Sequence, residues 1–271
     1  MGIAEQAAPE IDRLVIGVNR RVGPEHGERL SALALDIGLE SIELLPVFGD
    51  FLLDGLLSRQ VALLRMTYRP QDLVRARLEE LEEKGFIRQV NSGFEATEVL
   101  RPLLKAMRSA LGAVARDLWV DHEVEVSVIT EAARVLRDAI TPDQIVAATY
   151  KRVREPLDRY SLLEQRLVNL RYMRQHDHIQ AWTDRGLTAP EILMMTAISR
   201  GADTAADEET QQKLNEAGYL TKSDPPKLSA KGKKVRQAIE DDTNVRSQRS
   251  FDALDAESAD RFLEALRALP A

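Results

Sequence analysis

Residues 155–182, EPLDRYSLLEQRLVNLRYMRQHDHIQAW, join an apolar helical stripe to cationic, imidazole and indole side chains. The stripe consists of Tyr160, Leu163, Leu167 and Leu170, at the spacing of one buried helical face. The same face continues through Arg174, His178 and Trp182, with Arg171 beside it. Because a buried arginine is costly without an anion, this cluster predicts a ligand site. The arginines would grip a carboxylate or phosphate, the imidazole would hydrogen-bond and the indole would stack.

A purely structural role for this cluster competes with ligand binding. An ion pair of Arg174 with Asp177, or with another carboxylate, would lock one helix to another. His178 could act as a general base, but no nucleophile elbow, glycine-rich phosphate loop or paired carboxylates accompany it. His176 and His178 point to different sides of a helix and have no third ligand, which disfavours a metal site. We therefore expect no catalytic residues, no metal and no cofactor.

Composition narrows the classes of protein further. The 271-residue chain has a formal net charge of −7 and no cysteine, which excludes disulfides, thiol nucleophiles and cysteine zinc sites. No apolar run approaches the roughly 20 residues that cross a bilayer, and the first residues lack a secretory pattern, so we expect a cytoplasmic protein without membrane contact. The acidic balance counts against nucleic-acid binding unless basic residues gather on one face.

The elements that position these residues are predicted to be helices almost throughout. Within residues 98–118, apolar residues recur at spacings of three and four and predict one buried helical face. Residues 122–129, HEVEVSVI, alternate as a strand would, but their neighbours favour a helix. Ser229 and Asp255 are predicted to cap the helices that follow them.

A helix, a small hairpin and another helix follow one another in residues 70–120. The first helix is predicted from Pro70 to Gly85, with Leu73, Val74, Leu78 and Leu81 facing inward. Asn91-Ser92-Gly93 is a good turn sequence between two short strands, and Thr97 is predicted to cap the next helix. A helix over about 54–66 would support the first one. This order is typical of a winged helix-turn-helix.

The same order recurs later in the chain. Helices are predicted over 189–200 and 206–217, followed by a strand over 219–222, a turn at 223–226 and the cap at Ser229. Gly85 matches Gly218, and Thr97 matches Ser229 if one residue is dropped in the second turn. A repeat of this length favours duplication of one structural unit. Chance similarity between helical segments is the alternative.

These segments resemble MarR-type winged helix-turn-helix transcription regulators. The resemblance rests on L-x-x-x-G-[FY]-[IL] before a turn, a polar cap and a long helix, and on Leu228-Ser229, Gly232 and Asp255-Ala256-Glu257 near the end. It covers residues 188–271 well and 55–120 loosely, and leaves 121–187 unexplained. Because that family works as homodimers, two copies in one chain imply an internal pseudo-dimer, as a monomer or within a further dimer.

In such a unit the helix after the turn enters the major groove of DNA, and the wing reaches the phosphate backbone of the DNA. The contacts predicted in the first unit are Arg69, Gln71, Arg75, Arg77 and Arg88. Those predicted in the second unit are Gln212, Lys213, Lys222 and Lys227. Arginine suits phosphate and guanine because it donates two hydrogen bonds at once.

Charge weakens this interpretation. Val61 to Val90 hold six Lys and Arg against five Asp and Glu, and Asp207 to Arg236 hold seven against five. Asp207-Glu208-Glu209 would repel phosphate at the start of the second reading helix. These basic residues could therefore be ordinary solvated surface charges, and a helix-turn-helix can also serve as a scaffold.

The sequence as a whole predicts a mainly α protein with two winged helix-turn-helix units joined by a helical core. We expect an N-terminal unit over 1–120, a central helical segment over 121–187 and a C-terminal unit over 188–271. The expected function is transcription regulation through double-stranded DNA, with a small-molecule effector as a second partner. The alternative is a ligand-binding protein or enzyme that keeps a winged-helix frame without binding DNA.

Overall fold

The computed structural model describes residues 2–91, 93–202, 207–223 and 225–271. They divide into two compact units, Met1–Met173 with Gln248–Ala271, and Arg174–Ser247, called unit 1 and unit 2 below. The chain leaves unit 1 within α8 (Arg159–Thr183) and returns within α11 (Ala230–Phe251). This division rests on compactness, and the three functional domains expected from the sequence stay a prediction.

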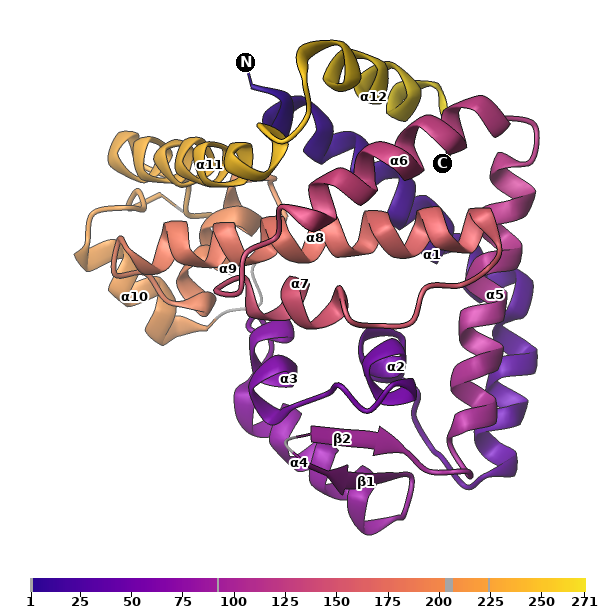
Figure 1. Cartoon of the computed structure of the whole chain (residues 1–271). Coiled ribbons are helices and arrows are strands. Elements are labelled where there is room, and N and C mark those ends of the chain that lie inside the picture. Colours follow the sequence, from indigo (N-terminus) through magenta and orange to yellow (C-terminus); the bar gives the residue numbers. More distant parts are fainter. Residues whose placement is uncertain (1, 92, 203–206, 224) are drawn as a thin grey trace. The chain divides into compact units, whose positions relative to one another are not determined.

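Unit 1 is built of helices with one small sheet (Figure 1). Besides the ends of α8 and α11, its elements are α1 (Ile3–Asp36), α2 (Leu45–Leu53), α3 (Arg59–Arg65), α4 (Gln71–Glu83), β1 (Ile87–Val90), β2 (Gly93–Ala96), α5 (Arg101–Trp119), α6 (Glu123–Asp138), α7 (Ile145–Tyr150) and α12 (Ala256–Ala268). The mainly helical fold predicted from the sequence is confirmed.

Helices α1, α5, α6 and α12 form the core of unit 1, where α5 packs on α1 and α12 packs on both α6 and α1. The apolar face predicted within residues 98–118 is buried at Leu104, Met107 and Leu118. The indole N–H of the fully buried Trp119 donates to the Pro270 carbonyl at 3.0 Å. Pro270 is therefore held against the end of α5.

The helix predicted over HEVEVSVI is confirmed, since α6 covers Glu123–Asp138. Its buried residues include Val126, Ile129, Ala133 and Leu136, which follow a helical spacing of three and four. The alternation of apolar and polar residues within 122–129 therefore does not indicate a strand. The helical spacing of apolar residues over the whole of α6 determines the structure.

The supporting helix predicted over about 54–66 is shorter than expected. Gly55 has a φ of +66° and Leu57 bridges Phe94 of β2, so this stretch is extended instead of helical. Ser58 then accepts a hydrogen bond from the Val61 N–H at 3.1 Å and starts α3 at Arg59. The prediction missed this cap. Just before it, Leu57 adds a single bridge to the edge of the hairpin at Phe94.

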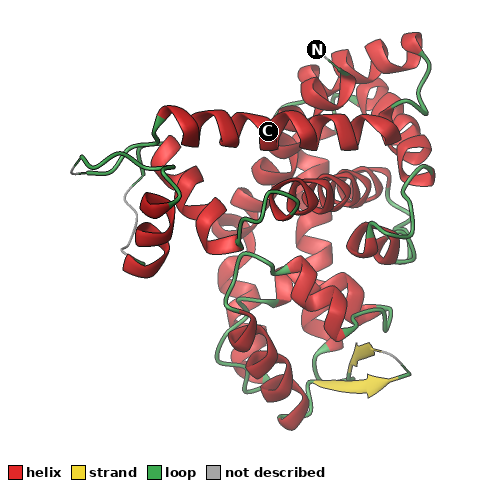
Figure 2. Cartoon of the chain, turned by 90° about the vertical axis from the view of Figure 1, so that its left-hand side faces the viewer, coloured by secondary structure: helices red, strands yellow, loops and turns green. Residues whose placement is uncertain are grey.

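Two further predictions in this region are wrong. Leu73 does not face inward: its side chain is 66% exposed, whereas Val74, Leu78 and Leu81 are buried as expected. Thr97 does not cap α5, because its hydroxyl donates to the Gly85 and Phe86 carbonyls and the helix begins only at Arg101. The predicted hairpin itself is confirmed, with Ile87 paired to Ala96 and Val90 to Gly93 (Figure 2). Ser92 in its turn lies outside the described residues.

Unit 2 contains α9 (Ala189–Ser199), α10 (Glu208–Glu216) and the adjoining parts of α8 and α11. The predicted caps at Ser229 and, in unit 1, Asp255 are confirmed, and Thr188 caps α9. The strand predicted over 219–222 is reduced to one bridge between Leu220 and Leu228. Ala206 and Asp224, which were assigned to the reading helix and to the turn, lie outside the described residues.

None of the helices in the described part of the chain has both the length and the apolar composition that a membrane crossing requires.

Candidate nucleic-acid interface

The turn between α3 and α4 is held by the side chain of Gln71. Its amide nitrogen donates to the Met66 carbonyl at 3.1 Å and to the Arg69 carbonyl at 3.2 Å. Pro70 precedes α4, where a fixed φ favours the start of a helix. Gln71, predicted to read bases, is therefore occupied in shaping the turn, and its amide oxygen is the atom left for a base.

Helix α4 presents a mixed outer face near its N-terminus. Val74 and Leu78 point into the core, and Asp72, Leu73 and Arg75 point outward. An exposed leucine beside an arginine suits a base edge better than water, because thymine carries a methyl group in the major groove. The four glutamates at 79, 80, 82 and 83 leave only the first half of α4 suited to a polyanion.

Each arginine predicted to contact DNA in unit 1 pairs with a carboxylate of the protein. Arg75 meets Asp72 at 2.9 Å and Arg69 meets Glu43 at 3.2 Å. Arg88 of the hairpin donates to Glu95 on the opposite strand at 2.6 Å. These arginines are more than half exposed, and exposed ion pairs contribute about 0–1 kcal/mol, so a phosphate can displace the carboxylates.

Arg77 differs from the other three. Its side chain is only 18% exposed, pairs with Glu80 and donates to the Ser41 carbonyl at 2.6 Å. Lys84 also contacts Glu80, and the hydrogen bonds from Lys84 and Arg77 lower the pKa of that carboxyl. Arg77 therefore holds the segment before α2 against α4, and a DNA contact would cost it these bonds.

Unit 2 repeats the backbone connections of this structure. Gly85 and Gly218 both have a φ of +74°, a conformation that glycine adopts without a steric penalty. The Thr97 hydroxyl donates to the Gly85 carbonyl at 2.8 Å, and the Ser229 hydroxyl donates to the Gly218 carbonyl at 2.7 Å. Equivalent side chains thus tie the helix end to the returning strand in both units.

The repeat begins earlier than the sequence suggested. Leu57-Ser58 precedes α3, and Leu187-Thr188 precedes α9, with a buried leucine followed by a hydroxyl N-cap in each case. The same leucine and hydroxyl pair is visible in the sequence. It was overlooked because the helix predicted over about 54–66 included Leu57 and Ser58.

The corresponding face of unit 2 is more acidic. Asp207 caps α10 by accepting from the Thr210 N–H, and Glu208 and Glu209 occupy the first turn. Gln212 donates to Glu216 at 2.8 Å, and Lys213 pairs with Glu209 at 2.7 Å. Lys222 and Lys227 lie near the bridge of the second hairpin, and no described carboxylate pairs with either.

Comparison with protein families assigns most of the chain to one family. A family model described as a helix-turn-helix family matches residues 70–271, more than half of the chain. The chain belongs to this helix-turn-helix family. The matched region of this helix-turn-helix protein starts at α4 and includes all of unit 2. Membership supports DNA binding, for which helix-turn-helix structures are built. No curated protein and no solved structure matches the chain.

The cluster predicted on α8 of this helix-turn-helix protein is already engaged within the protein. Arg171 pairs with Asp12 at 2.6 Å in unit 1. In unit 2, Arg174 donates to the Asn244 side chain at 2.9 Å, and His178 lies 3.1 Å from the Thr243 hydroxyl. Trp182 is buried. Burial is the main reason that the pKa of His178 is lowered, so the ring is neutral at pH 7.

A second polar cluster in the helix-turn-helix protein was not predicted. Asp50 of α2 accepts from Arg108 at 2.7 Å and from the Tyr150 hydroxyl at 2.5 Å. Glu164 of α8 is buried near them, and burial, then the charge of Asp50, raises its pKa to about 8 against the influence of Arg108 and Arg171. These residues lie on four helices, so local pattern could not reveal their proximity.

Proposed function

We propose that this helix-turn-helix protein is a transcription regulator whose α4 enters the major groove of double-stranded DNA. The observation that carries the proposal is the exposed first half of α4, which follows a short turn after α3 and presents Leu73 and Arg75 outward. The β1–β2 hairpin follows α4 directly, where a wing would place Arg88 at the backbone. Arg69 supplies a further phosphate contact.

Unit 2 is proposed to be a second winged unit, in the tandem MarR-type arrangement that forms an internal pseudo-dimer. The shared hydrogen bonds at Gly85 and Gly218 support this proposal. Lys222 and Lys227 of its hairpin are proposed to contact phosphates, with Gln212 and Lys213 on α10. The acidic start of α10 should make this contact weaker than that of α4.

Response to a small-molecule effector at Arg171, Arg174, His178 and Trp182 is a separate part of the proposal. An anion there would have to compete with Asp12 for Arg171 and with Asn244 for Arg174. Such an effector would act by favouring one conformation of the protein over another, with different affinities for DNA.

Binding to a labelled duplex of mixed sequence, measured by fluorescence anisotropy at increasing salt, tests the proposal. We expect affinity to fall steeply with salt. Arg75→Gln should weaken binding and reduce the salt slope by about 1, because one phosphate or base contact is lost. Asp72→Asn should tighten binding, because it releases Arg75 from its ion pair and removes a negative charge from the same face.

Arg134→Gln is the matched control. Arg134 is a half-exposed arginine on α6 that also pairs with a carboxylate, Glu131, but lies outside the helix-turn-helix. Its loss should change duplex affinity much less than the loss of Arg75. Absence of duplex binding at low salt, or equal effects of the two substitutions, would favour the rival function, a ligand-binding protein on a helix-turn-helix frame.

A further inference from the structure

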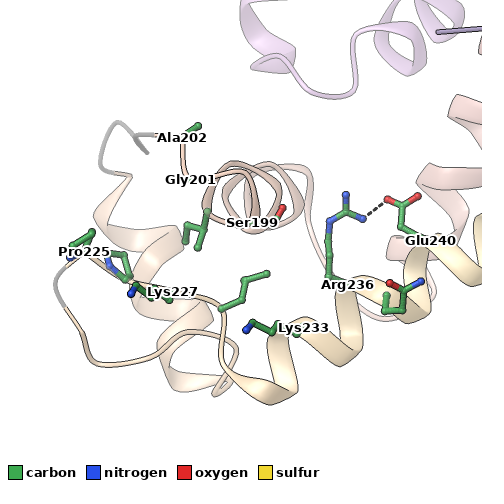
Figure 3. A pocket seen from close by; sticks show the side chains of 12 residues that line it. Ser199, Gly201, Ala202, Pro225, Lys227, Lys233, Arg236 and Glu240 are labelled. Atoms are coloured by element: carbon green, nitrogen blue, oxygen red, sulfur yellow. Dashed lines mark hydrogen bonds and ion pairs between the residues drawn. The ribbon is translucent and has the colours of Figure 1, made fainter. Parts of the chain in front are cut away.

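Unit 2 contains a pocket of about 880 Å³ between the end of α9, the loop of the second hairpin and α11. Figure 3 shows Ser199, Gly201 and Ala202 on one side, with Lys227 on the loop and Arg236 on α11. A volume of this size accommodates a small organic molecule, since ligand pockets span about 300–1,000 Å³. None of the residues predicted on α8 lines it.

The lining of the pocket is cationic. Lys227, Lys233 and Arg236 contribute positive charges, and Glu240 carries the one negative charge among the described residues that line it. No described carboxylate pairs with Lys227 or Lys233. Among the described residues, the pocket therefore has two cationic side chains without a carboxylate partner, in a protein whose net charge is −7.

Arg236 has unused hydrogen-bonding capacity. One terminal nitrogen pairs with Glu240, and the Nε atom is buried without an acceptor. Burial raises the pKa of Glu240, but the hydrogen bond from Arg236 and the charges of Arg236 and Arg174 lower it by more, so the carboxyl is ionised. The other terminal nitrogen has no hydrogen bond to a described residue, so an oxygen of a ligand in the pocket can accept from it.

Much of the remaining wall is apolar, with Ser199 and Gln237 as uncharged polar residues. Ile198, Leu228, Pro225 and Pro226 line the space beside the cations. A duplex backbone presents charged phosphates and small sugars and has no extended apolar body to fill such a pocket, whereas an organic acid presents both an anionic head and an apolar body. This combination separates a small-molecule site from a phosphate-binding surface.

We propose that the pocket binds a small organic anion, with its carboxylate or phosphate held by Lys233 and Arg236 and its apolar body against Ile198 and Leu228. The site shares no residue with those proposed above for the effector, and Lys227 in its described lining is also a proposed phosphate contact. Because Glu240 also pairs with Arg174 at 3.5 Å, an anion that takes Arg236 would alter the contacts of α8 with α11 within unit 2.

Titration of the full-length protein with naphthoate and with its neutral amide, naphthamide, tests this proposal. The two probes share a shape and differ in charge, and naphthoate fluorescence reports binding directly. We expect naphthoate to bind at least about tenfold more tightly than naphthamide. Lys233→Gln and Arg236→Gln should each weaken naphthoate by about tenfold or more. Lys234→Gln, which removes the same charge one position along α11 outside the pocket, should bind it as the unchanged protein does.

Phenyl phosphate and inorganic phosphate complete the experiment. Competition by phenyl phosphate but not by inorganic phosphate would show that the apolar walls contribute. Equal binding of naphthoate and naphthamide, no binding of either, or an affinity unchanged in both Lys233→Gln and Arg236→Gln would overturn the proposal. A further outcome is displacement of naphthoate by duplex DNA to the same extent from the unchanged protein and from Lys234→Gln. That result would instead show that DNA binds the cations of the pocket. Because the readout needs no DNA, this result is separate from that of the duplex experiment.

Discussion

Gly232→Ala is expected to destabilise unit 2 by about 3 kcal/mol, the upper part of the range for an added group in a packed site. A Cβ atom at Gly232 would lie 2.2 Å from the Tyr219 carbonyl oxygen, a backbone atom. That oxygen accepts from the Ser229 N–H at 2.9 Å, so it cannot retreat without breaking the connection between hairpin and helix. Hydrogen exchange should show the loss of protection in residues 207–247, with a lower urea midpoint.

Gly27→Ala provides the opposite control. Gly27 lies inside α1, and an added Cβ would meet no atom within 4 Å. We expect a gain of about 0.5–1 kcal/mol, because alanine loses less conformational freedom than glycine in a helix. If Gly232→Ala behaved like Gly27→Ala, the close approach of α11 to Tyr219 would be wrong.

Glu164→Gln is expected to make the protein more stable at neutral and alkaline pH and to leave its stability little changed at low pH. Burial, with the charge of Asp50, raises the pKa of Glu164 from 4.5 to about 8. The folded state therefore holds this proton more tightly than the unfolded state, so stability falls as pH rises from about 4.5 to about 8. The fall approaches about 1.4 kcal/mol per pH unit within that window, and glutamine cannot ionise.

Urea unfolding of both proteins at pH values across this window measures the effect. The difference between Glu164→Gln and the unchanged protein should grow with pH and level off above the pKa of Glu164. Glu264→Gln, on the exposed side of α12, is the matched control and should leave the pH dependence unchanged. The same slope in all three proteins would show that Glu164 is not held in its protonated form by its surroundings.

Local chemistry accounts for the parts of the fold that were predicted well. Pro70 and Gly85 bound α4 because proline favours the start of a helix and glycine adopts the positive φ that ends one. Ser229 and Asp255 accept hydrogen bonds from N–H groups three residues ahead, which needs no distant partner. For the same reason the repeat of helix, turn and cap in residues 214–232 was visible without coordinates.

Periodicity did not separate Leu73 from the inner face, and residue type misassigned Thr97 as a cap. Adjacent residues lie about 100° apart around a helix, so Leu73 and Val74 do not share one face, and the packing of α3 and the hairpin decides that Leu73 is the one left outside. Thr97 has the side chain of a cap, but the third residue after it is Leu100, which is fully buried. At the same place in unit 2 stands Gly232, whose missing side chain lets α11 begin directly after Ser229.

The sequence by itself determined that the chain is helical, where α4, α11 and α12 begin, and that one helix-and-hairpin pattern occurs twice, because these properties depend on residues within a few positions of one another. Only the tertiary structure decided which charged side chains are paired within the protein and which are available to a ligand. Asp50 meets Arg108 and Tyr150 from 58 and 100 positions away, and Arg174 meets Asn244 from 70. Whether a cation binds a ligand or an internal carboxylate depends on such distant neighbours, and a single sequence does not contain their distances.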